Sequence, residues 1–362
     1  MSHSGRSVAV PWNDQRPLPA YDLDHVLRHT QDLWEDLRGA HLFVTGGTGF
    51  FGRWMLESFL HANQELALGA RARVVSRNVP AFSERAPHVA ENTAIELVQA
   101  DIRSFDAAHE RFTHVLHMAA ETNTQLTFPP AAAYYDVIVR GTERVVDLAA
   151  ACGARRLLLV SSGAVYGTQP QGIARIAEDA PFAPRPDDLL SAYGQAKRCA
   201  EFLAFAKTEN TGPEVSVARC FAFVGPGLPL GSGFAVGNFI ADALTRRRIV
   251  IRGDGTPRRS YMYAGDLAIW LWTILVRGER GRPYNVGSDE ELSIARLAHT
   301  VAGLVEPPAD VVLLGDEAQR GVGGRYVPDV DRARSELRLA LSYGMEDALA
   351  RTIDWHRPGA TA

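Results

Sequence analysis

Short apolar runs alternate with helical patterns over residues 39–220. Runs of this length, rich in Val, Leu and Ile, are typical of strands that are buried on both faces of a sheet. They cover 41–45, 72–76, 94–100, 113–119, 156–161 and 214–219, and helical patterns at 51–62, 131–151 and 191–209 separate several of them. This alternation predicts an α/β fold, a doubly wound parallel (Rossmann-type) sheet with helices on both faces.

The two ends of the chain have a different texture. Residues 1–21 are polar and carry three prolines, which favours an extended arm, and apolar positions from Leu23 to Leu37 recur at helical spacing. We expect this amphipathic helix to dock on the sheet. After Arg219 short strands mix with helices near 236–247, 264–277, 292–304 and 346–355. The predicted organisation is an N-terminal arm and helix (1–38), a dinucleotide-binding domain (39–220) and a smaller mixed α/β substrate lobe (221–362) interleaved with it.

Charge and composition narrow the class of partner. The chain has 38 Lys and Arg against 42 Asp and Glu, a net charge of −4. Such a balance gives no overall field that would attract nucleic acid or acidic membranes, so local arginines must meet any anionic ligand. Three cysteines without CxxC spacing fit reduced thiols, and no apolar run has the length of a membrane span. We therefore expect a cytoplasmic protein with small-molecule partners, and neither nucleic acid nor membrane.

A glycine-rich loop follows the run at 41–45 directly and leads into an apolar helix. In this strand-loop-helix setting, glycines allow a tight turn, close approach of the backbone to a pyrophosphate and close packing of the helix. We assign the tight turn to Gly47, and the phosphates would sit at the helix N-terminus. The predicted cofactor contacts here are Gly46, Gly49, Phe50, Phe51 and Gly52.

Two further positions bear on the cofactor. The second predicted strand ends in Ser76 and Arg77, where an acid usually holds a free 2′-hydroxyl. Arginine there favours the 2′-phosphate of NADP, although Arg77 could also stack on adenine or be solvated. Asp101 and Ile102 follow the third run and could hold the adenine, with a turn or cap as the alternative role of Asp101. The cofactor prediction is NAD(P), with a lean to NADP.

Tyr193 and Lys197 lie four residues apart at the start of a predicted helix, so their side chains share one face. A nearby ammonium and an oxidised nicotinamide would lower the pKa of the phenol and make it a base for a substrate hydroxyl. Ser162, at the carboxyl end of a central strand, would hydrogen-bond the same oxygen. A YxxxK pattern is common on helices, so it indicates a catalytic pair here only because the glycine loop and Ser162 accompany it.

Together these residues resemble the extended short-chain dehydrogenases/reductases, within them the nucleotide-sugar epimerases and dehydratases. The resemblance covers nearly the whole chain after residue 39 and rests on TGGTGFFG, ADI, HMAA, SSGAVYG, YGQAK, RCFAFVGPG, GDGTPRRSYMYAGDLA and YNVGS. It implies a nucleotide-diphosphate sugar substrate and a homodimer through the helices at 131–151 and 191–209. The implied roles are Ser162, Tyr193 and Lys197 as the catalytic triad, His117, Ala119 and Ala120 as a wall beside the cofactor, and Asn238, Arg259 and, more loosely, Arg325 on the diphosphate. Each arginine could instead be a solvated surface charge.

The residues after Ser162 bear on the reaction. Related dehydratases and decarboxylases usually carry an acid there, whereas this chain has Gly163 and Ala164. Elimination of water needs an acid and a base beyond the tyrosine, but oxidation and reduction at C4 do not. We therefore predict an NAD(P)-dependent nucleotide-sugar epimerase that works through a 4-keto intermediate. An NADPH-dependent 4-keto-6-deoxy sugar reductase, a 4,6-dehydratase using Glu121 beside the substrate, and a non-enzymatic dinucleotide-sensing protein are the alternatives.

Two residues depart from the family pattern: Ile138 and Ala222 stand where asparagines are usual. They put in doubt the proton relay behind Lys197 and one contact to the sugar nucleotide. Metal binding is not expected, because His114 and His117 are three apart on a strand and point to opposite faces. The sequence does not identify the nucleotide base or the sugar of the substrate.

Overall fold

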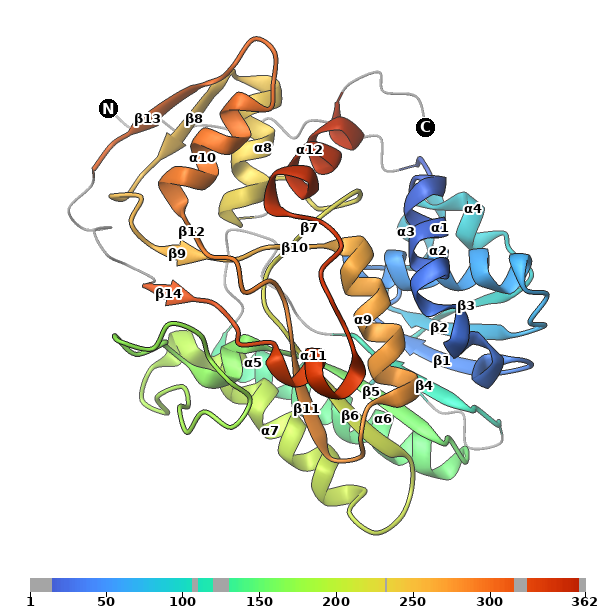
Figure 1. Ribbon diagram of the computed structural model, residues 1–362. Helices are drawn as coiled ribbons and strands as arrows, with labels where there is room; N and C mark the ends of the chain where they lie inside the picture. The colour runs from blue at the N-terminus through green and yellow to red at the C-terminus, as the bar shows by residue number, and fades with distance from the viewer. Residues whose placement is uncertain (1–14, 106–109, 120–129, 232, 316–323, 358–362) are drawn as a thin grey trace.

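A seven-stranded parallel sheet forms the centre of the computed structural model, which describes residues 15–105, 110–119, 130–231, 233–315 and 324–357 (Figure 1). The strand order is β11-β6-β5-β4-β1-β2-β3, and every neighbouring pair is parallel. The strands are β1 (His41–Thr45), β2 (Arg71–Ser76), β3 (Ile95–Gln99), β4 (His114–His117), β5 (Arg156–Ser162), β6 (Glu214–Cys220) and β11 (Arg282–Val286). The chain order of the strands runs outward from the β1–β4 pair to both edges of the sheet. This doubly wound order confirms the predicted Rossmann-type fold.

Helices cover both faces of the sheet because alternate side chains of each strand are apolar. In β5, Leu158 and Val160 join one core cluster with α2 (Phe50–Glu65) and α9 (Ala264–Arg277). Leu157 and Leu159 join the opposite cluster with α6 (Gly141–Ala151) and α7 (Ala192–Lys207). The helix predicted over 131–151 is continuous but not uniform: α5 (Ala131–Tyr135) passes through a π-helical turn, η2 (Asp136–Arg140), into α6.

The N-terminal helix docks on helices rather than on the sheet, so that expectation is wrong. α1 (Ala20–Thr30) continues as a 3-10 helix, η1 (Gln31–Leu37), and lies beside α9 and α2 (Figure 1). The Trp34 ring packs 4.9 Å from that of Trp272 on α9, and the Tyr263 hydroxyl donates to the buried Asp22 carboxylate at 2.7 Å. The physical reason is that α2 and α9 already cover this face of the sheet.

The chain after residue 221 builds an outer layer and also returns to the sheet. Two strands, β8 (Arg248–Ile251) and β13 (Asp310–Leu313), pair in parallel beside α8 (Ala235–Thr245) and α10 (Ile294–Gly303). The other elements here are β7 (Phe223–Val224), β9 (Arg258–Arg259), β10 (Met262–Tyr263), β12 (Leu292–Ser293), β14 (Arg325–Tyr326), α11 (Asp331–Leu337) and α12 (Met345–His356). Between β2 and β3 lie α3 (Val79–Arg85) and α4 (Pro87–Ala90), and between β5 and α7 lie η3 (Gly163–Tyr166) and η4 (Leu189–Ser191). Because β11 and α9 belong to the sheet layers, the two lobes are interleaved, and the boundaries at 38 and 220 stay a prediction.

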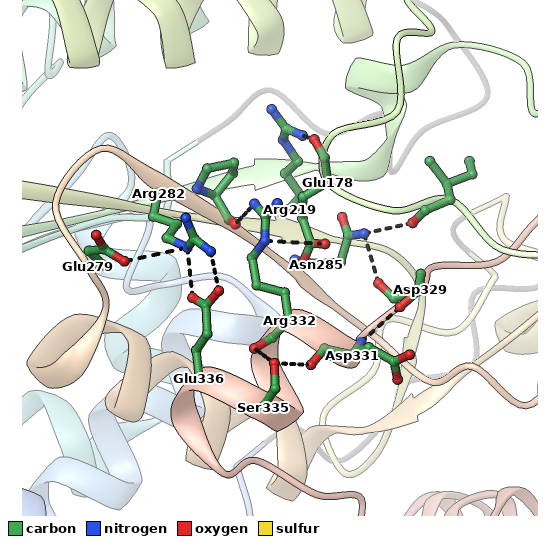
Figure 2. A network of polar contacts seen from close by, with 12 residues as sticks. Glu178, Arg219, Glu279, Arg282, Asn285, Asp329, Asp331, Arg332, Ser335 and Glu336 are labelled. Carbon is green, nitrogen blue, oxygen red and sulfur yellow. Dashed lines mark hydrogen bonds and ion pairs between the residues drawn. The ribbon is translucent and has the colours of Figure 1, made fainter.

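A buried polar network ties the C-terminal return to the sheet, as Figure 2 shows. The Asn285 amide of β11 donates to the carbonyl oxygens of Ile176 at 2.8 Å and Asp329 at 2.9 Å, and its backbone N–H donates to Glu178 at 2.8 Å. Val327, the residue after β14, is held as well, because its carbonyl accepts from the Ile176 N–H at 3.0 Å. These bonds fix the backbone just beyond β14, which carries Tyr326.

Candidate functional site

The glycine loop forms a cradle between β1 and α2. Gly46 has φ 72°, and a Cβ atom on it would lie 2.5 Å from the Met118 carbonyl carbon. A Cβ on Gly52 would lie 2.3 Å from the Gly47 Cα, so α2 packs directly against the loop. Gly49 is the N-cap of α2 and supplies no side-chain cap, which leaves backbone N–H groups for an anion. The loop therefore fits the pyrophosphate of a dinucleotide.

The tight turn belongs to Gly46 rather than to Gly47, which corrects our assignment. Gly47 is not in the left-handed region; a Cβ on it would meet the Val74 side chain of β2 at 2.6 Å. Phe50 and Phe51 open α2, with ring centroids 5.9 Å apart, and both pack against the core. Close packing of the helix therefore has a clear geometric basis at Gly52, whereas the role expected of Gly49 stays a prediction.

The residues expected near the adenosine lie at the ends of the next strands. Ser76 closes β2 with its hydroxyl 3.1 Å from that of Thr48 in the glycine loop, and Arg77 is exposed. Asp101 pairs with Arg103 at 2.6 Å, and this pair lowers the pKa of its carboxyl to about 2. Its carbonyl also accepts two turn bonds, so the alternative turn role is present. The adjoining Ile102 is buried.

Ser162, Tyr193 and Lys197 meet where β5 ends and α7 begins. The Ser162 hydroxyl accepts from the Ala164 N–H at 3.1 Å, and its proximity to the Tyr193 phenol lowers the pKa of that phenol. Lys197 is 3% exposed, and its Nζ donates to the Val160 carbonyl at 2.8 Å. The three predicted catalytic side chains are therefore brought together.

Burial dominates the pKa of the Tyr193 phenol in this structure, and the lowering expected from Lys197 together with an oxidised nicotinamide stays a prediction. Burial raises the pKa of Tyr193 to about 12, and only the nearby Ser162 hydroxyl opposes that shift. The Lys197 Nζ lies 6.0 Å from the centroid of the Tyr193 ring, and burial lowers its own pKa to about 8.

Tyr326 is a site residue that the sequence reasoning missed. Its ring packs on Phe221 with centroids 4.6 Å apart, and the nearby Ser162 hydroxyl opposes the rise that burial causes in the pKa of its phenol. A Cβ on Gly163 would lie 2.5 Å from the Tyr326 hydroxyl oxygen, so glycine at 163 leaves room for it. A strand of two residues, such as β14, is too short to show a hydrophobic period. It also lies in a C-terminal segment with few family motifs, so the sequence carried no signal for Tyr326.

The wall predicted beside the cofactor is partly described. His117 is buried between the Thr45 hydroxyl at 2.7 Å and the Thr142 hydroxyl at 3.0 Å, and burial lowers its pKa to about 3. The Ala119 N–H donates to Thr45 at 3.2 Å, which places Ala119 next to Gly46. The calls on Ala120 and Glu121 lie outside the described residues.

The residues expected on the diphosphate come from three separate elements. Asn238 is half-buried on α8. Arg259 of β9 is paired in register with Tyr326 of β14, and burial lowers the pKa of its guanidinium. Arg325 forms an ion pair with Glu291 at 2.8 Å and is not assembled with Ser162. Arg259 is therefore the best placed of the two arginines.

The departures from the family pattern have defined neighbours. Ile138 is buried in the π-helical turn and packs in a cluster with Tyr193, Tyr134 and Ala196. Ala222 is half-buried, and its carbonyl accepts from the Met262 N–H at 3.0 Å. Within the described residues no group of three His, Cys, Asp or Glu side chains is arranged to hold a metal ion, and no helix there has the length and apolarity of a membrane span.

Comparison with known proteins decides the family. The family model described as "NAD dependent epimerase/dehydratase family" matches residues 42–287. The chain belongs to this family. Membership supports an NAD-dependent enzyme of the extended short-chain dehydrogenase/reductase type, and the glycine cradle fits such a cofactor.

Individual members of the family that resemble this chain differ in reaction. UDP-glucuronic acid decarboxylase 1 of Arabidopsis thaliana is 26% identical over 321 residues, covering 86% of this chain and 68% of the relative. The structure of a DesIV double mutant, a dTDP-glucose 4,6-dehydratase of Streptomyces venezuelae with NAD and DAU bound, is 25% identical with a TM-score of 0.74, covering 88% of this chain and 97% of that one. The epimerase Mth375 of Methanothermobacter thermautotrophicus is 25% identical with a TM-score of 0.73, covering 91% and 95%.

Proposed function

We propose that the chain is an NAD(P)-dependent nucleotide-sugar epimerase that works through a 4-keto intermediate. The observation that carries this proposal is the position of Ser162 at the end of β5, beside Tyr193 and followed directly by Gly163 and Ala164. Oxidation and reduction at C4 need one hydride transfer and one proton transfer. Neither Gly163 nor Ala164 offers the further acid or base that removal of a C5 proton and loss of a hydroxyl would require.

The roles of the side chains follow from their positions. Bound NAD(P) supplies the hydride acceptor and the returning hydride. Ser162 holds the C4 oxygen of the sugar, and Tyr193 takes the proton of the C4 hydroxyl and later gives it back. Arg259 and Asn238 hold the diphosphate, so the sugar ring can turn between the two proton transfers while the nucleotide stays in place.

Decarboxylation of a nucleotide-bound uronic acid is the second candidate. A relative with 26% identity carries that name. A uronic acid oxidised at C4 is a β-keto acid, which loses CO2 when its C5–C6 bond breaks, without an additional base. The same Ser162 and Tyr193 would serve this reaction, so the released product separates it from epimerisation. The reductase and dehydratase hypotheses are separated in the same way.

The test is product analysis with the purified chain and NAD+ or NADPH. UDP-, dTDP-, CDP- and GDP-linked hexoses and uronic acids are supplied, and C4 epimers, CO2, 4-keto-6-deoxy sugars and loss of NADPH absorbance are measured. Tyr193→Phe should reduce turnover by about 10² to 10⁴-fold, because it removes the proton carrier. Tyr284→Phe is the matched control, since the Tyr284 hydroxyl accepts from the Glu279 N–H at 3.2 Å. Absence of C4 exchange with every sugar would contradict the proposal.

For the cofactor we propose NADP, on the basis of Ser76 and Arg77 at the end of β2. A guanidinium can pair with a 2′-phosphate, and a hydrogen bond to a charged group is worth about 1.5 to 3 kcal/mol. Arg77→Ala should therefore weaken NADPH binding by about tenfold or more and leave NADH binding unchanged. Fluorescence titration of both nucleotides measures this without a sugar, and equal effects on the two would refute the assignment.

We also propose a homodimer through α5, α6 and α7. Large apolar side chains are exposed on and beside this layer: Phe202 of α7 is 73% exposed and Leu190 of η4 is 82% exposed. Exposed apolar groups that cluster on one face favour association.

A further inference from the structure

Gln169 is a buried amide that joins two segments far apart in the chain. It is 6% exposed and lies a short way after η3. Its Nε2 donates to the carbonyl oxygens of Ile173 at 2.8 Å and Ala174 at 3.1 Å, and its Oε1 accepts from the Val327 N–H at 3.0 Å. The nitrogen and the oxygen of the amide are therefore both used by backbone groups. The side chain thus connects the segment at 169–178 to the residue that follows β14.

The two segments are bonded to each other beyond Gln169 as well. The Ile176 N–H donates to the Val327 carbonyl at 3.0 Å, and the Asp329 N–H donates to the Ile176 carbonyl at 2.8 Å. The buried Asn285 amide donates to the carbonyls of Ile176 and Asp329 (Figure 2). Because β14 has only two residues, these bonds just beyond it, together with its pairing to β9, determine where it lies.

The two faces of the β9–β14 pair have different partners. Residues in register on neighbouring strands share one face, and successive residues of a strand point to opposite faces. Arg258 is in register with Arg325, and the Glu291 carboxylate accepts from both, at 3.0 Å and 3.2 Å. Arg259 is in register with Tyr326, so it lies on the other face.

The face that carries Arg259 is turned toward the end of β5. The Tyr326 hydroxyl lies over Gly163, since a Cβ atom on this glycine would be 2.5 Å from it. The Arg259 Nη1 donates to the Gly324 carbonyl at 3.1 Å, so the guanidinium rests on the residue that precedes β14. A displacement of β14 would therefore carry the Arg259 guanidinium with it.

We propose that Gln169 is a positioning residue for the substrate diphosphate: through its bond to Val327 it holds β14 where the Arg259 guanidinium meets the diphosphate. This role rests on the proposed function, which assigns the diphosphate to Arg259. Loss of the amide leaves a buried N–H and two carbonyls without partners, which favours a shift of β14. Charge-assisted hydrogen bonds weaken steeply as their geometry departs from the ideal, so the diphosphate is then held less well.

The test measures the affinity of the full chain for nucleoside diphosphates. Calorimetric titration with UDP, dTDP, CDP and GDP identifies the nucleotide that binds the wild-type. Gln169→Met keeps the length of the side chain but not the amide, and should weaken this nucleotide by about tenfold, the scale of one hydrogen bond to a charged group. Gln169→Asn, one methylene shorter, cannot span both segments and should show the same loss; it covers a Gln169→Met variant that fails to fold. NADPH affinity should stay unchanged in both, because the glycine cradle lies between β1 and α2.

Asn63→Leu is the matched control. The Asn63 Nδ2 donates to the Ala70 carbonyl at 3.1 Å, and its Oδ1 accepts from the Ala70 N–H at 3.0 Å. This amide also joins backbone groups, but at the end of α2 and not at β14. Its replacement should leave the affinity for the nucleoside diphosphate unchanged.

A double-mutant cycle shows whether Gln169 acts through Arg259. Arg259→Ala should weaken the nucleotide by itself, and adding Gln169→Met to it should have no further effect. With a sugar nucleotide that the chain turns over, Gln169→Met should raise KM and leave kcat unchanged, because the diphosphate is held equally in the ground state and the transition state. A general loss of stability would not produce this division between KM and kcat.

Three results would overturn the inference. The first is an unchanged affinity in Gln169→Met and Gln169→Asn, the second is an equal loss with and without Arg259, and the third is a wild-type that binds none of the four nucleotides. Nucleotide binding that depends on Gln169 through Arg259, in a chain that performs no C4 exchange, would contradict the proposed epimerase and leave this inference standing.

Discussion

Replacing Lys197 with methionine should make the protein more stable at neutral pH while removing its activity. Lys197 is 3% exposed, and burial lowers the pKa of its ammonium from 10.5 to about 8. Below pH 8 the lysine is charged in both the folded and the unfolded chain, and the folded state bears the cost of holding that charge away from water. Methionine fills a similar volume without the charge.

The magnitude and its sign follow from linkage. Between pH 8 and 10.5 the unfolded chain binds a proton that the folded chain does not, so the stability of the wild-type rises with pH across this window. Lowering the pKa of Lys197 from 10.5 to about 8 corresponds to a loss of about 3 kcal/mol in the free energy of unfolding, which applies in full below pH 8. Loss of the Lys197–Val160 hydrogen bond costs about 1 kcal/mol. Lys197→Met should therefore be about 2 kcal/mol more stable at pH 7 and about 1 kcal/mol less stable near pH 10.5.

Urea unfolding of both proteins from pH 6.5 to 10.5 measures this difference. Lys207→Met is the matched control, because Lys207 pairs with Asp147 at 2.7 Å and its pKa is raised. Its contribution is present below the unfolded pKa of lysine and lost as pH rises through the folded one, so this variant should lose no more than about 0.5 kcal/mol at pH 7. A stability difference for Lys197→Met that does not change with pH would refute the reasoning.

Three other predictions concern the N-terminal helix, the glycine loop and the assembly. Burial raises the pKa of Asp22 to about 6, so its charge destabilises the folded chain above that pH. Asp22→Asn should therefore raise the free energy of unfolding by up to about 2 kcal/mol at pH 7 and leave it unchanged below pH 4. Urea unfolding measures this, and a difference that is the same at every pH would contradict it. Gly52→Ala would place a Cβ atom 2.3 Å from the Gly47 Cα and should abolish NAD(P)H binding, measured by fluorescence titration. Gly303→Ala, which meets no atom within 4 Å, should retain binding and raise the free energy of unfolding by about 0.5 kcal/mol, measured from melting curves. Phe202→Asp should convert a dimer to a monomer in light scattering, and an unchanged mass would remove α7 from the interface.

Local patterns were enough to predict six of the seven strands of the sheet and the glycine loop, but not β11. The run at 41–45, the loop and the helix that starts at Phe50 are consecutive, so period and glycine spacing locate them, although they did not show that Gly46 makes the tight turn. The same holds for Tyr193 and Lys197, which share one helix. The cofactor and catalytic roles of these residues stay predictions, whereas the family and the fold class are confirmed.

Contacts between distant segments could not be predicted in this way. Tyr326 reaches Ser162 across 164 positions, through a strand of two residues whose place depends on Asn285 and its backbone partners. The docking of α1 was misjudged for the same reason, because α9, which covers the sheet, comes more than 230 residues later. Periodicity tells which face of an element is apolar, but not which element covers it.

The Lys197 prediction also bears on how the site is built. If the ammonium is destabilising and does not contact the Tyr193 phenol closely, its place under β5 is not explained by folding or by the pKa of Tyr193. A charge held at a cost is expected where a ligand uses it. A stabilised and inactive Lys197→Met would assign the lysine to binding or catalysis rather than to folding.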